Sequence, residues 1–155
     1  MLTSERAYQK LKYYCSYRER CHYEVKEKLF GLGLSKTLVE SLLSRLIEED
    51  YLNEERYAVQ FAGGHFRIRQ WGKRKIRAAL QQKRVSEANI RIGLRSIESG
   101  DYEATLQKLT KARWDFLRKE QYLNRMAKTT AYLLQKGYEP SHIQPVIAAI
   151  RAAEK

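Results

Sequence analysis

The chain has few of the residues that mark several common protein classes. Its 155 residues include two cysteines, two prolines and eight glycines. So little cysteine excludes a disulfide-rich scaffold, and so little glycine and proline argues against a loop-rich β protein. No apolar run is long enough to cross a membrane, and the charged first residues do not resemble a signal peptide. We therefore expect a cytoplasmic protein in which Cys15 and Cys21 are small buried hydrophobes rather than a disulfide or metal ligands.

Catalytic motifs are missing as well. The three histidines, His22, His65 and His142, are widely spaced, and none belongs to a zinc-hydrolase pattern. There is no glycine-rich phosphate loop, and the few aspartates are not paired at metal-binding spacing. The residue types of a tyrosine recombinase are present, but no local signature supports that activity. We expect no enzyme, no catalytic residue, no metal and no cofactor, and a dispersed active site stays open as an alternative.

What the sequence does contain is one apolar pattern that occurs three times. The shared positions are Val25, Leu29, Leu34, Val39, Leu43 and Leu46, then Ile76, Leu80, Val85, Ile90, Leu94 and Ile97, then Thr129, Leu133, Tyr138, Ile143, Ile147 and Ile150. Gly33, Arg84 and Gly137 share a further position at a turn, and the two glycines lie where a left-handed residue is expected to end a helix. A repeated helical unit builds an extended surface, which favours a binding protein over an enzyme.

Helical periodicity continues along the whole chain and predicts about nine helices. We expect an all-α tandem repeat of three three-helix units, elongated and curved, at residues 1–52, 53–100 and 101–155. The expected helices are 3–16, 20–31, 35–49, 53–69, 71–83, 86–98, 101–119, 121–136 and 140–153. The short helix pairs resemble helix-turn-helix motifs, which by themselves do not imply that DNA is read.

Local signals support these helix ends. Side chains that can accept a hydrogen bond from a helix's first turn are expected at Ser35, Asn53, Ser86 and Asp101. Pro145 predicts a late start or a small kink in the last helix. Gly63 and Gly64 lie inside the fourth helix, where we expect them to permit close helix approach, with a bend or an adaptable joint as alternatives.

Positive charge is concentrated away from the first unit. The net charge is +12, with 9 basic and 8 acidic residues in 1–50, 11 and 4 in 51–100, and 10 and 6 in 101–155. Residues 65–77 hold six Arg or Lys and no acidic residue. A polyanionic surface, either phosphates or an acidic protein groove, would complement this stretch. The candidate contact residues are Arg67, Arg69, Lys73, Arg74, Lys75, Arg77, Lys83 and Arg84.

The basic stretch could instead be a solvated face with no partner, or the contact could lie among Lys108, Lys111 and Arg118. We expect Trp71 and Ile76 to be structural. The abundant tyrosines, Tyr13 and Tyr17 among them, are expected to pack at the core and its rim, with base stacking as the functional alternative.

Several segments together resemble the RecX family of regulatory proteins. These are Tyr51–Ala58 (YLNEERYA), Gln70–Ile76 (QWGKRKI) with Leu80, Tyr17–Glu24 (YRERCHYE) and Leu133–Tyr138 (LLQKGY). The middle motif is the most specific of them. The chain departs from the family pattern at Asn53, where aspartate is usual, at Cys21, where serine is common, and at Arg84, where glycine is usual.

The resemblance implies a non-enzymatic regulator that binds the RecA recombinase. Proteins of this kind lie along the groove of a RecA–single-stranded DNA filament and mainly inhibit its ATPase, strand exchange and growth, in recombination, DNA repair and the SOS response. A monomer is the default, and direct contact with DNA stays open. The alternative from the residues themselves is a helix-turn-helix transcriptional regulator that binds one duplex sequence.

Overall fold

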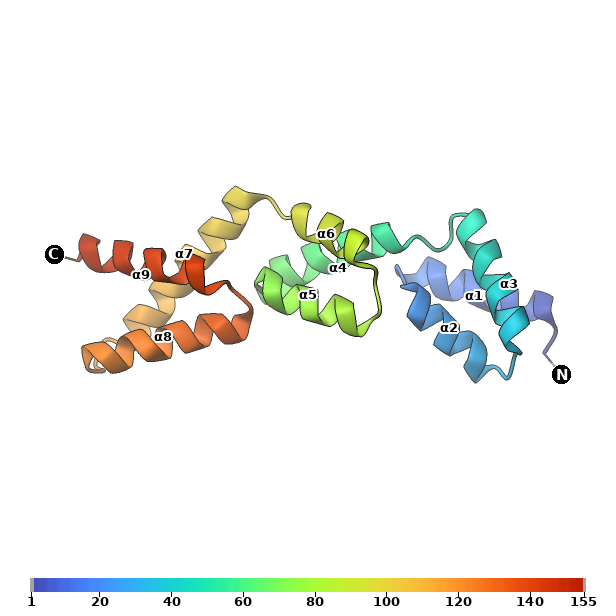
Figure 1. The fold of residues 1–155 in the computed structure, drawn as a ribbon, viewed down its shortest axis with the longest axis horizontal. Helices are drawn as coiled ribbons and strands as arrows, with labels where there is room; N and C mark the ends of the chain where they lie inside the picture. The colour runs from blue at the N-terminus through green and yellow to red at the C-terminus, as the bar shows by residue number, and fades with distance from the viewer. Residues whose placement is uncertain (1, 155) are drawn as a thin grey trace. The chain divides into compact units, whose positions relative to one another are not determined.

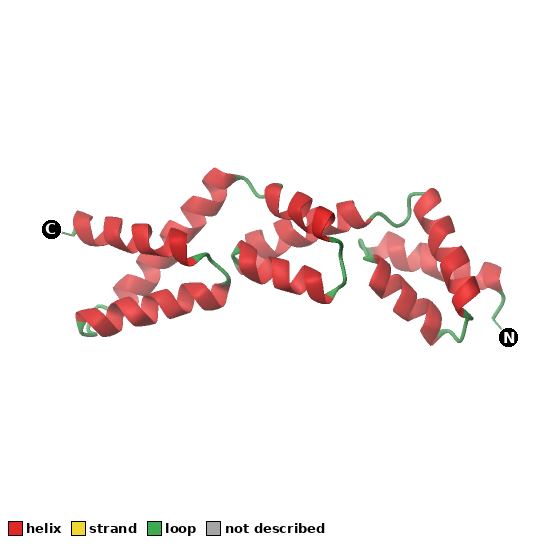
Figure 2. Cartoon of the chain, viewed as in Figure 1, coloured by secondary structure: helices red, strands yellow, loops and turns green. Residues whose placement is uncertain are grey.

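The computed structural model describes residues 2–154, and helices joined by short turns account for this part of the chain (Figure 1). No strand occurs in residues 2–154, as the colouring of Figure 2 makes visible. The helices are α1 (Ser4–Tyr17), α2 (His22–Gly31), α3 (Lys36–Glu48), α4 (Glu54–Arg69), α5 (Lys73–Gln82), α6 (Glu87–Arg95), α7 (Ser99–Phe116), α8 (Tyr122–Lys136) and α9 (Pro140–Ala153). The expected all-α architecture of three-helix repeats is confirmed, and no helix end differs by more than three residues from its expected place.

The backbone groups into two compact units. One holds the residues up to Phe61 together with Ala79–Gly93, and the other holds Ala62–Ala78 together with the residues from Leu94 onward. Helices α4, α5 and α6 therefore each contribute to both units. The repeat boundaries expected at residues 52/53 and 100/101 stay predictions.

The apolar positions shared by the repeats form the interior. All of them are buried except Leu34 and Ile150, which are partly exposed. Thr129, the one polar residue in the pattern, is fully buried, and its Oγ1 has no hydrogen-bond partner among the described residues. The pattern thus marks core positions correctly even where a hydroxyl replaces a methyl group.

The turn position shared by the repeats has one backbone conformation. Gly33, Arg84 and Gly137 have φ angles of 84°, 59° and 103°, all in the left-handed region. Glycine adopts this region freely, whereas a residue with a Cβ pays about 1 kcal/mol or more. Arg84 therefore keeps the turn of its repeat at a local cost, and its guanidinium lies 4.6 Å from the ring centroid of Tyr23.

Three of the four expected helix caps are confirmed. Ser35 Oγ accepts from the Leu38 N–H at 3.3 Å, Asn53 Oδ1 from the Arg56 N–H at 2.9 Å, and Ser86 Oγ from the Asn89 N–H at 3.2 Å. The cap expected at Asp101 is wrong, because α7 begins at Ser99 and the Glu98 carbonyl already accepts from the Tyr102 N–H at 3.0 Å.

The structure excludes the close helix approach expected at Gly63 and Gly64 and one of the two outcomes expected at Pro145. The three atoms nearest to a Cβ on Gly63 all belong to the Arg67 guanidinium of its own helix, and a Cβ on Gly64 would meet nothing within 4 Å. This glycine pair therefore permits no close helix approach, and α4 runs on through it. The late start, one of the two outcomes expected from Pro145, does not occur, since α9 begins at Pro140 and contains Pro145, and the small kink stays a prediction.

Both cysteines are free and buried, as expected. Burial raises the pKa of each thiol to about 11, so both are neutral near pH 7. Cys21 also precedes α2 as its N-cap, where its backbone N–H donates to the Glu24 carboxylate at 3.1 Å. Among residues 2–154, no helix combines the length and the hydropathy of a membrane span.

Candidate interaction surface

The basic start of α5 is held by the turn between α8 and α9. The Gly72 N–H donates to the Lys136 carbonyl at 2.7 Å, and the Arg74 N–H donates to the Gly137 carbonyl at 2.9 Å. The Lys73 N–H donates to the Tyr102 hydroxyl at 2.9 Å. These are N–H groups that the first turn of a helix leaves without an intrahelical partner. Residues more than 25 positions away thus satisfy the helix start and fix its direction.

Two glycines make this contact possible. A Cβ on Gly72 would lie 2.3 Å from the Gly137 carbonyl carbon, and a Cβ on Gly137 would lie 2.4 Å from the Lys75 Cβ. Both distances are far below van der Waals contact, so the two backbones touch where side chains would hold them apart. The glycine of the QWGKRKI segment is therefore needed for packing.

A buried tyrosine pair supports the same contact. The Tyr102 hydroxyl donates to the Glu139 carboxylate at 3.0 Å, and the Tyr138 hydroxyl donates to the Gln70 carbonyl at 2.9 Å. Their ring centroids are 5.2 Å apart. Burial raises the pKa of both phenols well above the usual value of 10, so both keep the proton they donate.

The basic side chains that surround this contact reach solvent. Arg67, Arg69 and Arg74 are exposed, while Lys73 and Lys75 are half-buried. Within residues 2–154, no carboxylate lies in ion-pair distance of these five side chains. No carboxylate of the described residues therefore neutralises their charge, which is available to a bound anion.

Trp71 lies among these cations. The Lys75 Nζ lies 4.8 Å and the Arg69 guanidinium 5.8 Å from its ring, and its ring centroid is 4.6 Å from that of His65. The structural role expected for Trp71 is met by the histidine contact, while Ile76 is fully buried. The partly exposed indole also orients two of the cations, because its face attracts positive charge.

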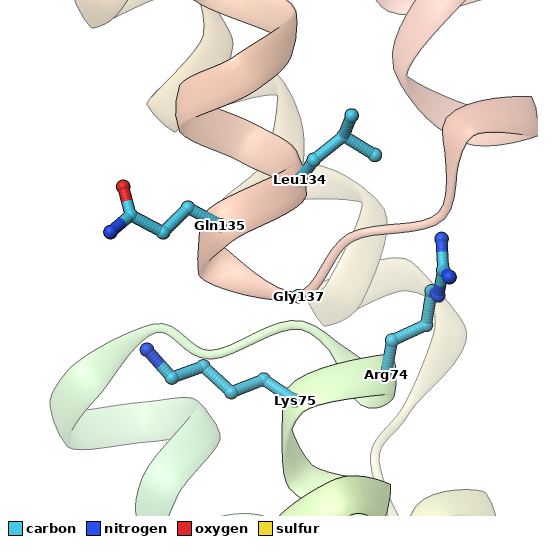
Figure 3. A pocket seen from close by; sticks show the side chains of 5 residues that line it. All are labelled: Arg74, Lys75, Leu134, Gln135 and Gly137. Carbon is cyan, nitrogen blue, oxygen red and sulfur yellow. The ribbon is translucent and has the colours of Figure 1, made fainter.

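A shallow pocket opens beside this surface (Figure 3). Its volume is about 480 Å³, and it is lined by Arg74 and Lys75 from α5 and by Leu134, Gln135 and Gly137 from the end of α8. In Figure 3 the two cationic side chains lie on either side of Gly137. Leu134 is 40% exposed. Cations beside an exposed leucine suit an acidic side chain that is next to an apolar one.

The structure divides the candidate residues between the two units. Arg67, Arg69, Lys73, Arg74, Lys75 and Arg77 all belong to the unit that contains Ala62–Ala78. Lys83 and Arg84 belong to the other unit and have local partners there. The Lys83 Nζ is 3.9 Å from the Glu24 carboxylate, and Arg84 lies over Tyr23. We define the basic surface as the first six residues, and its function stays a prediction.

Sequence reasoning missed the residues of α7 and α8 that complete this surface. Tyr102, Leu134 and Lys136 are 25 or more positions from the basic stretch of residues 65–77, and nothing in their local pattern links them to it. Lys136 Nζ donates to the Arg69 carbonyl at 2.7 Å. The one sequence signal for this contact was Gly137. Its position in the repeat predicts a turn but does not indicate which segment packs against that turn.

The fold and this surface define a helical-repeat protein. Its basic surface surrounds the point where the backbones of Gly72 and Gly137 are in contact. Family models match residues 53–94 as the second three-helix domain of RecX and residues 101–147 as the third. A Clostridium perfringens (strain SM101) protein named "Regulatory protein RecX" is 32% identical over 117 residues, which are 74% of this chain and 54% of that protein. Its namesake from Lacticaseibacillus paracasei is 27% identical, over 88% of this chain and 57% of that protein. The chain belongs to the RecX family of regulatory proteins.

Solved structures agree on the fold. A crystal structure of RecX from Lactobacillus salivarius matches with a TM-score of 0.89 at 21% identity, covering 96% of this chain and 97% of that one. A second crystal structure, of a regulatory protein RecX, matches with a TM-score of 0.84, covering 94% and 71%. The chain spans about half the length of the curated relatives it matches. These relatives do not favour a helix-turn-helix transcriptional regulator.

Proposed function

We propose that this protein regulates the RecA recombinase by binding the RecA–single-stranded DNA filament and mainly inhibiting it. The inhibited steps are ATP hydrolysis, strand exchange and filament growth, in recombination, DNA repair and the SOS response. The protein acts as a cytoplasmic monomer and has no catalytic chemistry of its own. Membership of a family of regulatory proteins supports this proposal, and so does the charge of the basic surface.

The observation that carries the proposal is the set of cations at the fixed start of α5, where Lys73, Arg74 and Lys75 have no carboxylate of the described residues in ion-pair distance. Because Gly72, Lys73 and Arg74 have their N–H groups bound by α7 and by the α8–α9 turn, the backbone beneath the cations is ordered before any partner arrives. Less conformational entropy is then lost on binding. Fixed positive charge complements the acidic groups or phosphates of a nucleoprotein filament and speeds encounter with it.

Occupancy alone explains inhibition in this proposal. A protein bound across neighbouring RecA subunits blocks the site that a second DNA molecule or the next subunit must reach. It also biases the subunits toward the arrangement that it binds, and the shift equals its preference for that arrangement. No group of this chain has to react.

The test is binding to a preassembled filament. Cognate RecA is loaded on surface-attached single-stranded DNA with a non-hydrolysable ATP analogue, and binding of this protein is measured against the same DNA without RecA. The proposal expects tighter binding to the filament than to the bare DNA. Equal binding to both would contradict it, because RecA would then contribute nothing.

A further inference from the structure

We propose that an aromatic groove on α1 and α2 binds single-stranded nucleic acid by stacking bases on tyrosine rings. The groove has a volume of about 640 Å³. It belongs to the unit that contains the N-terminal helices, whereas the basic surface defined above belongs to the other unit. Three tyrosines and three cations line it: Tyr13, Tyr14, Tyr17, Lys10, Arg20 and Lys28. We call it the tyrosine groove.

The two outer rings are exposed to an unusual degree for this chain. Tyr13 is 74% and Tyr17 is 75% exposed, whereas Tyr8, Tyr102 and Tyr138 are 5% exposed or less. Tyr13 and Tyr17 are four residues apart on α1, so their side chains share one helix face. Packing at the core rim, which the sequence favoured for the tyrosines, does not describe these two rings.

The inner part of the groove is ordered. The Arg20 guanidinium lies 3.7 Å and the Lys28 Nζ 5.5 Å from the ring centroid of Tyr14. Arg20 is only 7% exposed, and its Nε donates to the Tyr14 carbonyl at 3.0 Å. A cation this buried keeps its position when a ligand arrives. The exposed rings therefore lie beside a fixed positive charge.

The chemistry of the groove selects its ligand. Among residues 2–154 no acidic residue lines the groove, so phosphates meet cations at its lining. Bases of a single strand present free faces that stack on aromatic rings, whereas a duplex hides these faces. An acidic peptide would use the cations but would leave the exposed faces of Tyr13 and Tyr17 without a role. Single-stranded nucleic acid uses both features.

The test separates stacking from charge attraction. A fluorescein-labelled oligothymidylate and an abasic oligomer of the same length are titrated with the protein, and binding is followed by fluorescence anisotropy. We expect the wild type to bind the oligothymidylate at least about tenfold more tightly than the abasic strand. Replacing Tyr13 and Tyr17 by alanine should remove that difference, and Tyr13→Phe with Tyr17→Phe should keep it. A wild type that binds both strands equally would overturn the proposal.

A matched control uses a tyrosine elsewhere. Tyr122 is 44% exposed on α8, and Arg151 lies 4.2 Å from its ring. Tyr122→Ala should leave the affinity for oligothymidylate within about twofold of wild type, well below the change expected on losing a stacked base. Circular dichroism checks that each variant is folded. A loss as large in Tyr122→Ala as in the double alanine variant would contradict the assignment to this groove.

No recombinase is present in these titrations, so their failure leaves the proposed function intact. Filament binding by the double alanine variant provides the third arm. If the variant binds oligothymidylate as the wild type does but binds the RecA filament more weakly, the groove contacts protein and the inference is wrong. If the double alanine variant no longer prefers oligothymidylate over the abasic strand, the inference is supported, whether or not its binding to the RecA filament changes.

Discussion

At the scale of single residues, one turn position has different surroundings in each repeat. Gly33 lies in open space, Arg84 has its side chain over Tyr23, and Gly137 touches Lys75. All three have positive φ, so the backbone conformation is the same while the surroundings differ. The cost of a Cβ should therefore depend on the repeat.

Alanine at two of these positions tests that dependence. Gly33→Ala should lower the free energy of unfolding by about 1 kcal/mol, the cost of a left-handed alanine with room around it. Gly137→Ala adds a clash with Lys75 at 2.4 Å and should cost more than about 2 kcal/mol. Urea unfolding of both variants measures the difference. Equal losses would show that the contact between Gly72 and Gly137 is not tight.

His22 predicts a pH dependence of stability. Burial and the nearby Lys26 hold the pKa of this imidazole below its ordinary 6.5, although Glu54 lies 3.0 Å from its Nδ1. The neutral ring can donate its Nδ1–H to that carboxylate. Between the lowered pKa and 6.5 the unfolded chain binds more protons than the folded one. The free energy of unfolding should therefore fall as the pH drops through this window.

Glutamine at position 22 is the matched control, since it can donate a hydrogen bond but does not titrate. Urea unfolding of His22→Gln should show a smaller loss between pH 7 and the acid end of that window than the wild type does. Burial raises the pKa of Glu54, which acts in the opposite sense at lower pH, so the difference between the two proteins isolates His22. Parallel profiles would contradict the direction assigned to the histidine.

At the scale of helices, the start of α4 is stabilised both by an N-cap hydrogen bond and by ion pairs, and Arg56 takes part in both. Asn53 accepts from the Arg56 N–H, while the Arg56 side chain binds Glu19 at 2.6 Å and Asp50 at 3.3 Å. Asn53→Ala should lower the unfolding free energy by about 1 kcal/mol. Asn53→Asp, the usual residue of the family, should keep or raise it, because a negative charge suits the positive helix end. A thermal or urea melt ranks the three proteins, and an alanine variant as stable as wild type would exclude the cap.

Substituting a leucine at a repeat position should lower the free energy of unfolding more than substituting an exposed leucine. Leu80 is fully buried, whereas Leu123 on α8 is 77% exposed. Leu80→Ala should cost roughly 2–5 kcal/mol, and Leu123→Ala less than about 0.5 kcal/mol. Chemical unfolding monitored by circular dichroism measures both. Similar losses would mean that the threefold pattern does not mark the core.

At the scale of the whole molecule, the sequence predicted what depends on local pattern. Apolar spacing located the buried positions, and the shared turn position grouped Arg84 with the two glycines that were expected to be left-handed. The contact of Gly72 with Gly137 could not be predicted from the sequence, because no residue near Gly72 indicates which segment of backbone approaches it. The same holds for Gly93, whose Cβ would lie 2.7 Å from the Ala58 carbonyl oxygen. Distant segments of the chain explain why glycine is needed at Gly72 and Gly93. The atoms nearest to a Cβ on Gly63 instead belong to Arg67 of the same helix, and a Cβ on Gly64 would meet nothing within 4 Å.

The basic surface predicts a localised charge effect on filament binding. Reversing Arg67, Arg69 and Arg74 to glutamate should weaken binding at least about tenfold, because each reversal replaces attraction by repulsion. The matched control reverses Lys108, Lys111 and Arg118, which changes the net charge equally on and just after α7. It should weaken binding by less than about threefold, as expected for rim charges. The opposite ranking, in the filament-binding assay, would move the contact to α7.

The most direct measurement is DNA-dependent ATP hydrolysis by the cognate RecA, titrated with this protein. The wild type should inhibit hydrolysis to a saturating level, and the α7 control should follow the same curve. The variant with Arg67, Arg69 and Arg74 reversed should need at least about tenfold more protein for the same inhibition. Hydrolysis unchanged at saturating wild-type protein would contradict the proposal that this chain regulates the RecA filament.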